Sequence, residues 1–471
     1  MIHVRHRRPS WLLLFSLLAL LLSHADTAPA LAATSTRTEQ GWLVTEEVLP
    51  NGLTVLILED HRAPAVTLQV WYKVGSRNER LGNTGISHLL EHLMFRGTSK
   101  YGKGEFSKLV QATGGTDNAF TSDDQTVYFE NSSAPHIDLL VSLEADRMVN
   151  LSLDETGFQA ERKIVMEERR MRTTDDPSTD LFEQLSAAAY TAHPYGWPTV
   201  GWMSDLEAMT LDDVQKYRQI YYAPNNAILV IAGDVSPETL LPKIRAEFGP
   251  AQANTPPPPV TAKEPPQRGE RRVMLKRPAS LPIYMAAYHT PNFQHEDSFS
   301  LSMLAIVLAG GRSSRLQLSL VEKKALALSA DADYSRTSLD PTLFYLSMRV
   351  APGKKWQEAE AALYQEIEKM KTILVGDKEL QRAQNLVEAS FIYGQDSLFY
   401  RTRQLGQYAL LGDWKLIDKV IPGIRAVTAA DIQRVAQTYL REDNRTVGLL
   451  VPEGTPVRER PPTELGTRAG H

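Results

Sequence analysis

Two histidines and one glutamate stand in the pattern H-x-x-E-H at residues 88–92 of this chain. The neighbouring residues are apolar enough for a buried helix. With about 100° between successive residues, His88 and His92 lie about 40° apart on that helix, and Glu91 falls on the same side. Neutral imidazoles are good zinc ligands, and the carboxylate can take a proton from water activated by the metal. The pattern therefore predicts a catalytic zinc site.

A catalytic zinc needs one further protein ligand and an open coordination position. Residues 161–168 alternate charged and apolar side chains, which taken alone is typical of a solvated helix face. Glu161 and Glu168 lie within about 20° of one another on such a helix. From spacing alone, either glutamate could face the metal while the other supports it.

A structural interpretation must be weighed against this chemistry. A single histidine in an apolar helix is usually a hydrogen-bonded core residue. Three polar groups on one inward face need a joint explanation, because burying them without partners costs about 2–7 kcal/mol each.

The composition limits the alternatives. The 471 residues are 42% hydrophobic and 23% charged, within the range of globular proteins. The chain has no cysteine, so thiol nucleophiles, disulfides and zinc-cysteine sites are excluded. Its net charge of −5 comes with no basic patch, so we expect no nucleic-acid partner.

Residues 1–32 have the layout of a signal peptide. Three arginines precede an apolar run at residues 11–22, and Ala30 and Ala32 supply small residues for cleavage. The run is shorter than the roughly 20 residues that a membrane-spanning helix needs, so we expect no membrane span after cleavage. Retention as an anchor is the alternative. The expected destination is secretion, into the periplasm of a Gram-negative bacterium.

A proline-rich segment at residues 250–272 is predicted to link two domains, at residues 40–249 and 273–455, with a polar tail at 456–471. The domains look duplicated, since residues 210–226 match residues 428–444 at a constant offset. In each copy a helix ending in tyrosine precedes an apolar strand. We therefore expect an α+β fold of two homologous domains, each a mainly antiparallel sheet with helices packed on one face.

Four segments together resemble the pitrilysin (M16) family of inverted-motif zinc peptidases, in particular shorter two-domain members such as the mitochondrial processing peptidase beta subunit. These segments are residues 85–98, 115–128, 161–168 and 193–201. The resemblance implies the LuxS/pitrilysin-like metallohydrolase fold. It also implies one Zn²⁺ per chain and a zinc metalloendopeptidase activity.

The resemblance also assigns residue roles. In the family pattern E-R-x-x-x-x-x-E the last glutamate is the third zinc ligand, so Glu168 takes that role. Glu161 becomes the carboxylate that orients the ligands, and Glu167 is expected to face solvent. Asn118 and Ala119 resemble the edge strand on which family members bind an extended peptide substrate.

The chain departs from the family at one place. Members that cleave alone or as homodimers carry an Arg and, seven residues later, a Tyr in the C-terminal half, which stabilise the oxyanion. The corresponding positions here are Val321 and Leu328. We therefore expect a heterodimer with a homologous zinc-less subunit that supplies Arg and Tyr, rather than a homodimer. Alternatively, Tyr334, Arg312 or Arg315 substitutes for the missing pair.

Two other functions compete with the peptidase. One is a non-catalytic scaffold or binding subunit, since the same fold serves structurally in respiratory complexes. The other is a periplasmic metal-binding protein, which would not need Glu91. Two histidines and a carboxylate would also accept manganese or cobalt.

Overall fold

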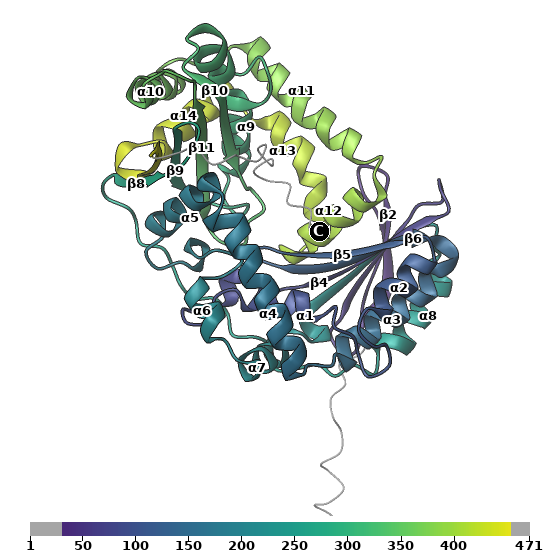
Figure 1. Ribbon diagram of the computed structural model, residues 1–471. Helices are drawn as coiled ribbons and strands as arrows, with labels where there is room; N and C mark the ends of the chain where they lie inside the picture. The colour runs from purple at the N-terminus through teal and green to yellow at the C-terminus, as the bar shows by residue number, and fades with distance from the viewer. Residues whose placement is uncertain (1–30, 454–471) are drawn as a thin grey trace, which may run out of the picture.

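The computed structural model describes residues 31–453, which form two α+β domains built on two β-sheets (Figure 1). The first sheet has the strand order β1-β2-β3-β7-β4-β6-β5, and all its neighbouring strands are antiparallel except β3 and β7. Its strands are β1 (Leu31–Arg37), β2 (Leu43–Val48), β3 (Thr54–Glu59), β4 (Ala65–Tyr72), β5 (Thr116–Thr121), β6 (Thr126–Ser133) and β7 (Ala227–Gly233).

The second sheet repeats the arrangement of the first. Its order is β10-β11-β9-β12-β8, with β12 and β8 parallel and the other pairs antiparallel. Its strands are β8 (Arg271–Arg277), β9 (Ile283–Thr290), β10 (Ala327–Tyr334), β11 (Thr342–Val350) and β12 (Arg445–Pro452). Read from β8 to β10, the order matches β3-β7-β4-β6-β5, as a duplicated domain requires.

Local contacts in the duplicated segment repeat as well. Thr210 and Thr428 each cap a helix: the threonine hydroxyl accepts from the backbone N–H of the aspartate three residues later, and that carboxylate accepts from the threonine N–H. The Asn226 side chain donates to the Tyr221 carbonyl, and Asn444 donates to that of Tyr439, at 2.8 and 2.9 Å. The constant sequence offset therefore reflects repeated structure.

Each domain contributes its own set of helices. In the first domain they are α1 (Ile86–Leu93), α2 (Glu105–Ala112), α3 (Ile137–Asn150), α4 (Glu155–Arg169), α5 (Pro177–Ala189), α6 (Met203–Ala208), α7 (Leu211–Tyr221) and α8 (Pro237–Phe248). In the second they are α9 (Ser298–Ala309), α10 (Trp356–Thr372), α11 (Asp377–Gly394), α12 (Leu398–Leu410), α13 (Val420–Ala426) and α14 (Ala429–Tyr439). No helix within residues 31–453 is long and apolar enough to cross a bilayer.

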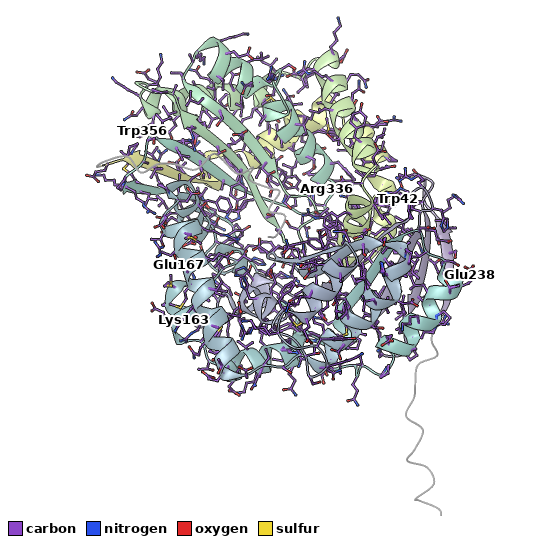
Figure 2. All side chains as sticks on the ribbon, turned by 45° about the vertical axis from the view of Figure 1, so that its right-hand side comes forward. Trp42, Lys163, Glu167, Glu238, Arg336 and Trp356 are labelled. Atoms are coloured by element: carbon purple, nitrogen blue, oxygen red, sulfur yellow. The ribbon has the colours of Figure 1, made fainter. Side chains whose placement is uncertain are left out.

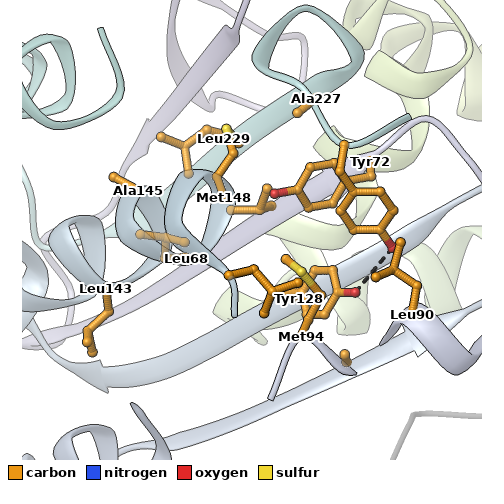
Figure 3. Close-up of a cluster of buried hydrophobic side chains, with 14 of the residues drawn as sticks. Leu68, Tyr72, Leu90, Met94, Tyr128, Leu143, Ala145, Met148, Ala227 and Leu229 are labelled. Atoms are coloured by element: carbon orange, nitrogen blue, oxygen red, sulfur yellow. Dashed lines mark hydrogen bonds between the residues drawn. The ribbon is translucent and has the colours of Figure 1, made fainter. Parts of the chain in front are cut away.

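The apolar side of α1 is part of the core of the first domain. Leu90 and Met94 lie beside the rings of Tyr72 and Tyr128 from the sheet (Figure 3). Burying a leucine side chain contributes about 1.5–3 kcal/mol, so this packing holds α1 firmly against the sheet.

The two domains exchange helices across their boundary (Figure 1). Helix α5 of the first domain packs on β12, β8 and β9 of the second sheet, whereas α12 of the second domain packs on β7 and β4 of the first. Each domain's own helices therefore cover one face of its sheet, and a helix from the other domain covers part of the opposite face. The exchange fixes the domains relative to one another.

The domain limits differ in detail from the sequence prediction. Strand β1 starts before residue 40 and includes residues 31 and 32 of the expected signal peptide, because it pairs with β2. Strand β8 begins at Arg271, inside the expected linker, because β12 offers it a parallel partner. Residues 251–270 contain no helix or strand. The remainder of the predicted signal peptide and the tail at 456–471 lie outside the described residues.

The helix exchange depends on one close contact. A Cβ atom on Gly406 of α12 would lie 2.2 Å from the Trp71 ring of β4. In a helix, Gly→Ala normally stabilises by about 1 kcal/mol. We expect Gly406→Ala instead to lower the free energy of unfolding by about 1–3 kcal/mol, measured by urea denaturation. The loss should shrink in a Trp71→Phe background, and an equal loss in both backgrounds would contradict this contact.

Candidate metal centre

Helix α1 carries three polar side chains on a mostly buried surface. His88 is 7% exposed and Glu91 is 9% exposed. The rings of His88 and His92 lie with their centroids 4.8 Å apart. The helix starts at Gly85, whose φ of 85° favours glycine, and a Cβ there would lie 2.3 Å from the Val200 carbonyl oxygen. The start of α1 is thus fixed by backbone packing.

Helix α4 places a carboxylate against both imidazoles. Glu168 Oε2 lies 3.5 Å from His88 Nε2 and 3.4 Å from His92 Nε2. Within residues 31–453 these three form the one cluster of histidine and acidic side chains that could hold a metal ion, with ligand atoms within 4.8 Å of one another. The structure thus places the histidines of α1 next to Glu168 of α4, which lies about 76 residues later in the sequence.

These distances suit a bound zinc ion. Zinc–nitrogen and zinc–oxygen bonds of about 2.0–2.2 Å at a tetrahedral angle put neighbouring ligand atoms about 3.3–3.5 Å apart. Both distances exceed the usual length of an N–H···O hydrogen bond. Moreover, no group within residues 31–453 donates a hydrogen bond to Glu168 Oε2, although this oxygen is buried. A cation between the three atoms would supply the missing partner.

Two glutamates on α4 are each held between a histidine and an arginine. Glu161 Oε2 lies 3.6 Å from His92 Nδ1, and its Oε1 accepts a hydrogen bond from Arg96 at 3.2 Å. Glu168 Oε2 faces the imidazoles, while its Oε1 forms an ion pair with Arg172. Each arginine binds the outer oxygen, so the inner oxygen stays directed at a histidine. His92 Nδ1 faces Glu161, which leaves Nε2 for a metal.

The charges of the cluster shift its pKa values in opposite directions. Burial alone would raise the pKa of Glu168, but His92, His88 and Arg172 lower it to about 2. Burial alone would lower the pKa of His92, but Glu161 and Glu168 raise it to about 9. The cluster therefore attracts positive charge strongly, whether a proton or a metal cation.

Glu91 has the properties of a general base. Burial raises the pKa of its carboxyl group to about 7, against a hydrogen bond from Thr121 that lowers it. Thr121 Oγ1 donates to Glu91 Oε2 at 2.5 Å from the end of β5. A group that titrates near neutrality can both take and return a proton.

Strand β5, which contains Asn118 and Ala119, lies at the edge of the first sheet. The Ala119 N–H donates to the Asn118 side-chain oxygen at 2.8 Å, so this backbone donor is turned away from β6. The strand ends at Thr121, which contacts Glu91. An extended peptide added to this edge would lie beside α1.

In the second domain, the helix that corresponds to α1 has no histidine or glutamate. This helix is α9, which occupies the place of α1 and contains only serine and apolar residues. Tyr334 donates to the Pro291 carbonyl oxygen at 2.6 Å, and Arg315 forms two hydrogen bonds with Glu379. Arg312 is exposed and lies in no ion pair within residues 31–453. Two of the three candidate substitutes for the missing Arg and Tyr are therefore bound to other groups.

Sequence reasoning missed three residues that support the site. Arg172 stands four residues after Glu168 and pairs with it, so helical spacing could have indicated it. Arg96 gave no such signal, because it follows α1 and pairs with Glu161 of α4. Thr121 gave no local signal, because its contact with Glu91 depends on how β5 meets α1.

The neighbouring acid Glu167 does not belong to the site. Its side chain is 52% exposed and pairs with Arg170 on the outer surface of α4. Glu167 and Lys163 both lie on this outer side of the helix (Figure 2).

Comparison with known proteins gives two family matches. Residues 54–201 match the family described as insulinase (peptidase family M16), and residues 208–387 match the peptidase M16 inactive domain. The zinc protease PqqE of Helicobacter pylori is 33% identical over 409 residues, covering 86% of this chain and 92% of that protein.

Solved structures agree with these matches. The crystal structure of a protease from Helicobacter pylori has a TM-score of 0.83 at 31% identity, covering 89% of this chain and 99% of that chain. A chain of complex III2 from Candida albicans has a TM-score of 0.72 at 15% identity, covering 86% of this chain and 95% of that one. The second likeness concerns the fold alone.

Adjacent glutamates provide a test of the metal cluster. We expect Glu168→Gln to weaken zinc binding by at least about 100-fold, because one of the three converging ligand atoms loses its charge. Glu167→Gln is the matched control and should leave affinity unchanged. Competition with a chromogenic chelator measures both. Equal affinities of the two variants would show that the metal is held elsewhere.

Proposed function

This chain belongs to peptidase family M16, and from that premise we propose that it is a zinc-dependent endopeptidase that cleaves peptides or unfolded protein segments. The observation that carries the proposal is the convergence of His88, His92 and Glu168 beside the buried carboxylate of Glu91. A scaffold has no physical need for such a group of polar side chains.

The proposed chemistry divides roles among these residues. Zinc held by His88, His92 and Glu168 would supply Lewis acidity, which lowers the pKa of water and polarises a peptide carbonyl. Glu91 takes the proton from the attacking water and returns it to the leaving amine. Glu161 holds the His92 ring by its Nδ1 side, so that Nε2 stays directed at Glu168.

We propose that the substrate binds in extended form along β5. Three observations support this placement: β5 is an edge strand, the Ala119 N–H does not bond to β6, and Thr121 at the end of β5 contacts Glu91. A peptide strand would displace the Asn118 side chain from the Ala119 N–H and run towards Glu91.

Completion of the site by a partner is part of the proposal. Leu328 stands where the family has the oxyanion-stabilising Tyr, and it is 53% exposed on the edge strand β10. Since Tyr334 and Arg315 are bound elsewhere, a homologous zinc-less subunit that supplies Arg and Tyr accounts best for the missing groups. A homodimer would bring a second copy of the same deficiency.

We also propose export of the chain to the periplasm of a Gram-negative bacterium. The sequence of residues 1–32 supports this, with its arginines, apolar run and small residues at the expected cleavage position.

The alternative is a non-catalytic scaffold or binding subunit. The fold shared with a chain of complex III2 and the match of residues 208–387 to an inactive domain favour it. A fold alone does not decide function, so turnover must.

Replacing the proposed base separates the peptidase from the two functions without catalysis. We expect Glu91→Gln to keep stoichiometric zinc and to lose about 10²–10⁴-fold in kcat on a quenched fluorescent peptide, because proton transfer is lost. Wild-type protein, assayed with the same related subunit, should hydrolyse the peptide. A wild-type chain that binds zinc but is inactive even with its related subunit would favour the scaffold or the metal-binding protein.

The requirement for a partner is tested by measuring kcat of the chain with and without a related subunit. The chain alone should hydrolyse the peptide poorly, and a related subunit carrying the Arg and Tyr should raise kcat by about 10²–10³-fold, the range expected for an oxyanion donor. Replacing that Arg and Tyr in the added subunit is the control. Full activity of the chain alone would refute the requirement for a partner.

A further inference from the structure

One sequence motif has no part in the proposed metal chemistry. Residues 193–201 lie outside the metal cluster, yet the structure places two of them in a buried contact between the domains. Here His193 and Tyr195 meet Arg77, Asp124 and Asp340, and we call these five side chains the polar junction. The first four belong to the first domain, and Asp340 belongs to the second.

Asp124 contacts the first domain through one carboxylate oxygen and the second domain through the other. Its Oδ1 accepts a hydrogen bond from the Tyr195 hydroxyl at 2.7 Å and lies 3.4 Å from Arg77 Nε. Its Oδ2 accepts from the Leu339 backbone N–H of the second domain at 3.0 Å. The side chain is buried, so these contacts are made without competition from bulk water.

Asp340 forms the other half of the junction. Its carboxylate pairs with Arg77 and lies 3.2 Å from His193 Nε2, while its backbone N–H donates to the Tyr195 hydroxyl at 3.1 Å. His193 Nδ1 accepts from the Tyr195 N–H, so Nε2 is the nitrogen that donates to Asp340. The second domain is therefore held by a charged pair and by directed hydrogen bonds.

One path leads from the junction to the general base. Asp124 lies in the turn between β5 and β6, which the bond from Ser122 N to the Gln125 carbonyl closes at 2.9 Å. Thr121 directly precedes this turn and donates to Glu91. The position of the turn thus sets where the Thr121 hydroxyl meets the Glu91 carboxylate.

A second path leads to the start of α1. The Arg77 N–H donates to the Asp123 carbonyl at 3.0 Å, which ties the chain before α1 to the same turn. Two residues later, Glu79 accepts hydrogen bonds from Gly85 N and Ser87 N at 2.7 and 2.8 Å. Gly85 has no capping side chain, so Glu79 takes the place of the N-cap group of the helix that carries the histidines.

We propose that the polar junction is a positioning device through which the second domain aligns Glu91 and α1 for catalysis, with Asp340 as the positioning residue on the side of the second domain. The proposal rests on the proposed peptidase function. It gives the domain without a metal cluster a role inside its own chain, in addition to any role of a partner subunit. The motif at residues 193–201 then serves the site indirectly.

The test compares two Asp→Asn variants that each weaken one Asp–Arg pair between the domains. Asp340→Asn weakens the junction, whereas Asp60→Asn weakens the pair with Arg401 of α12. Asp60 follows β3 and has no hydrogen bond or ion pair with α1 or β5 within residues 31–453, so it controls for a general loosening of the domains. Both variants should keep stoichiometric zinc.

We expect Asp340→Asn to lower kcat by about tenfold or more with little change in KM, because the base and the metal helix lose their alignment. Asp60→Asn should keep the wild-type kcat even where its melting temperature falls as far. Equal kcat values for the two variants would overturn the proposal.

Hydrogen exchange gives a measure that needs no activity. In Asp340→Asn, amides at residues 79–92 and 116–126 should exchange at least about fivefold faster than in wild type, and in Asp60→Asn they should not. If the wild-type chain and its partner fail to cleave peptides, the proposed function fails, and exchange alone decides whether the junction positions α1 and β5. Unchanged exchange in both segments would overturn the positioning role.

If Asp340→Asn does not fold, Tyr195→Phe tests whether the polar junction positions α1 and β5. It removes only the hydroxyl that bonds Asp124 and the Asp340 N–H. We expect the same two segments to exchange faster by about fivefold or more, in line with the loss of two buried hydrogen bonds. Wild-type exchange in this variant would contradict the proposal.

Discussion

The structure depends on the need to satisfy polar side chains that a largely apolar helix carries into the protein interior. His88 and Glu91 are buried on α1, whose leucines belong to the core. Buried imidazole and carboxylate groups are costly unless they find partners or a cation. Those partners come from elsewhere in the chain: Glu168 from α4 and Thr121 from β5. The packing of α4 and of the edge strand around α1 is therefore specified by polar contacts as well as by burial of apolar surface.

The second domain shows how the corresponding helix packs when it carries no buried histidine or carboxylate. The second sheet has the same strand order, and α9 stands where α1 stands in the first domain, but α9 is apolar apart from its serines. It packs as ordinary core, with Leu301, Leu304 and Leu308 fully buried. The second domain contributes instead through its boundary, where α12 covers part of the first sheet and Asp340 pairs with Arg77.

Local patterns account for what the sequence predicted well. Helical spacing placed His88, Glu91 and His92 on one face, and the offset between residues 210–226 and 428–444 predicted two homologous domains, which agrees with the repeated strand order. Spacing alone left the choice between Glu161 and Glu168 open, because both lie on one face of α4, and family resemblance was needed to select Glu168. The exchange of α5 and α12 had no local signal, since an amphipathic helix does not reveal which sheet it covers. The same holds for Asp340, whose partners lie in the other domain, and for Glu264, which anchors the linker by accepting three backbone N–H bonds at residues 191–193.

The arrangement of charge at the cluster of His88, His92 and Glu168 favours a cation, although the chain has no cysteine. Arg96 and Arg172 each bind the outer oxygen of a glutamate, which leaves the inner oxygen to face the histidines. These inner oxygens attract positive charge. They favour the protonated form of His92 and raise its pKa to about 9, although burial alone would lower it. A dication would bring more positive charge than a proton and could be held by His88, His92 and Glu168 together. Burial raises the pKa of the Glu91 carboxyl group to about 7, and this group accepts a hydrogen bond from the hydroxyl of Thr121 rather than pairing with an arginine. The partners that the rest of the fold supplies thus give the two histidines and Glu91 different surroundings on one helix.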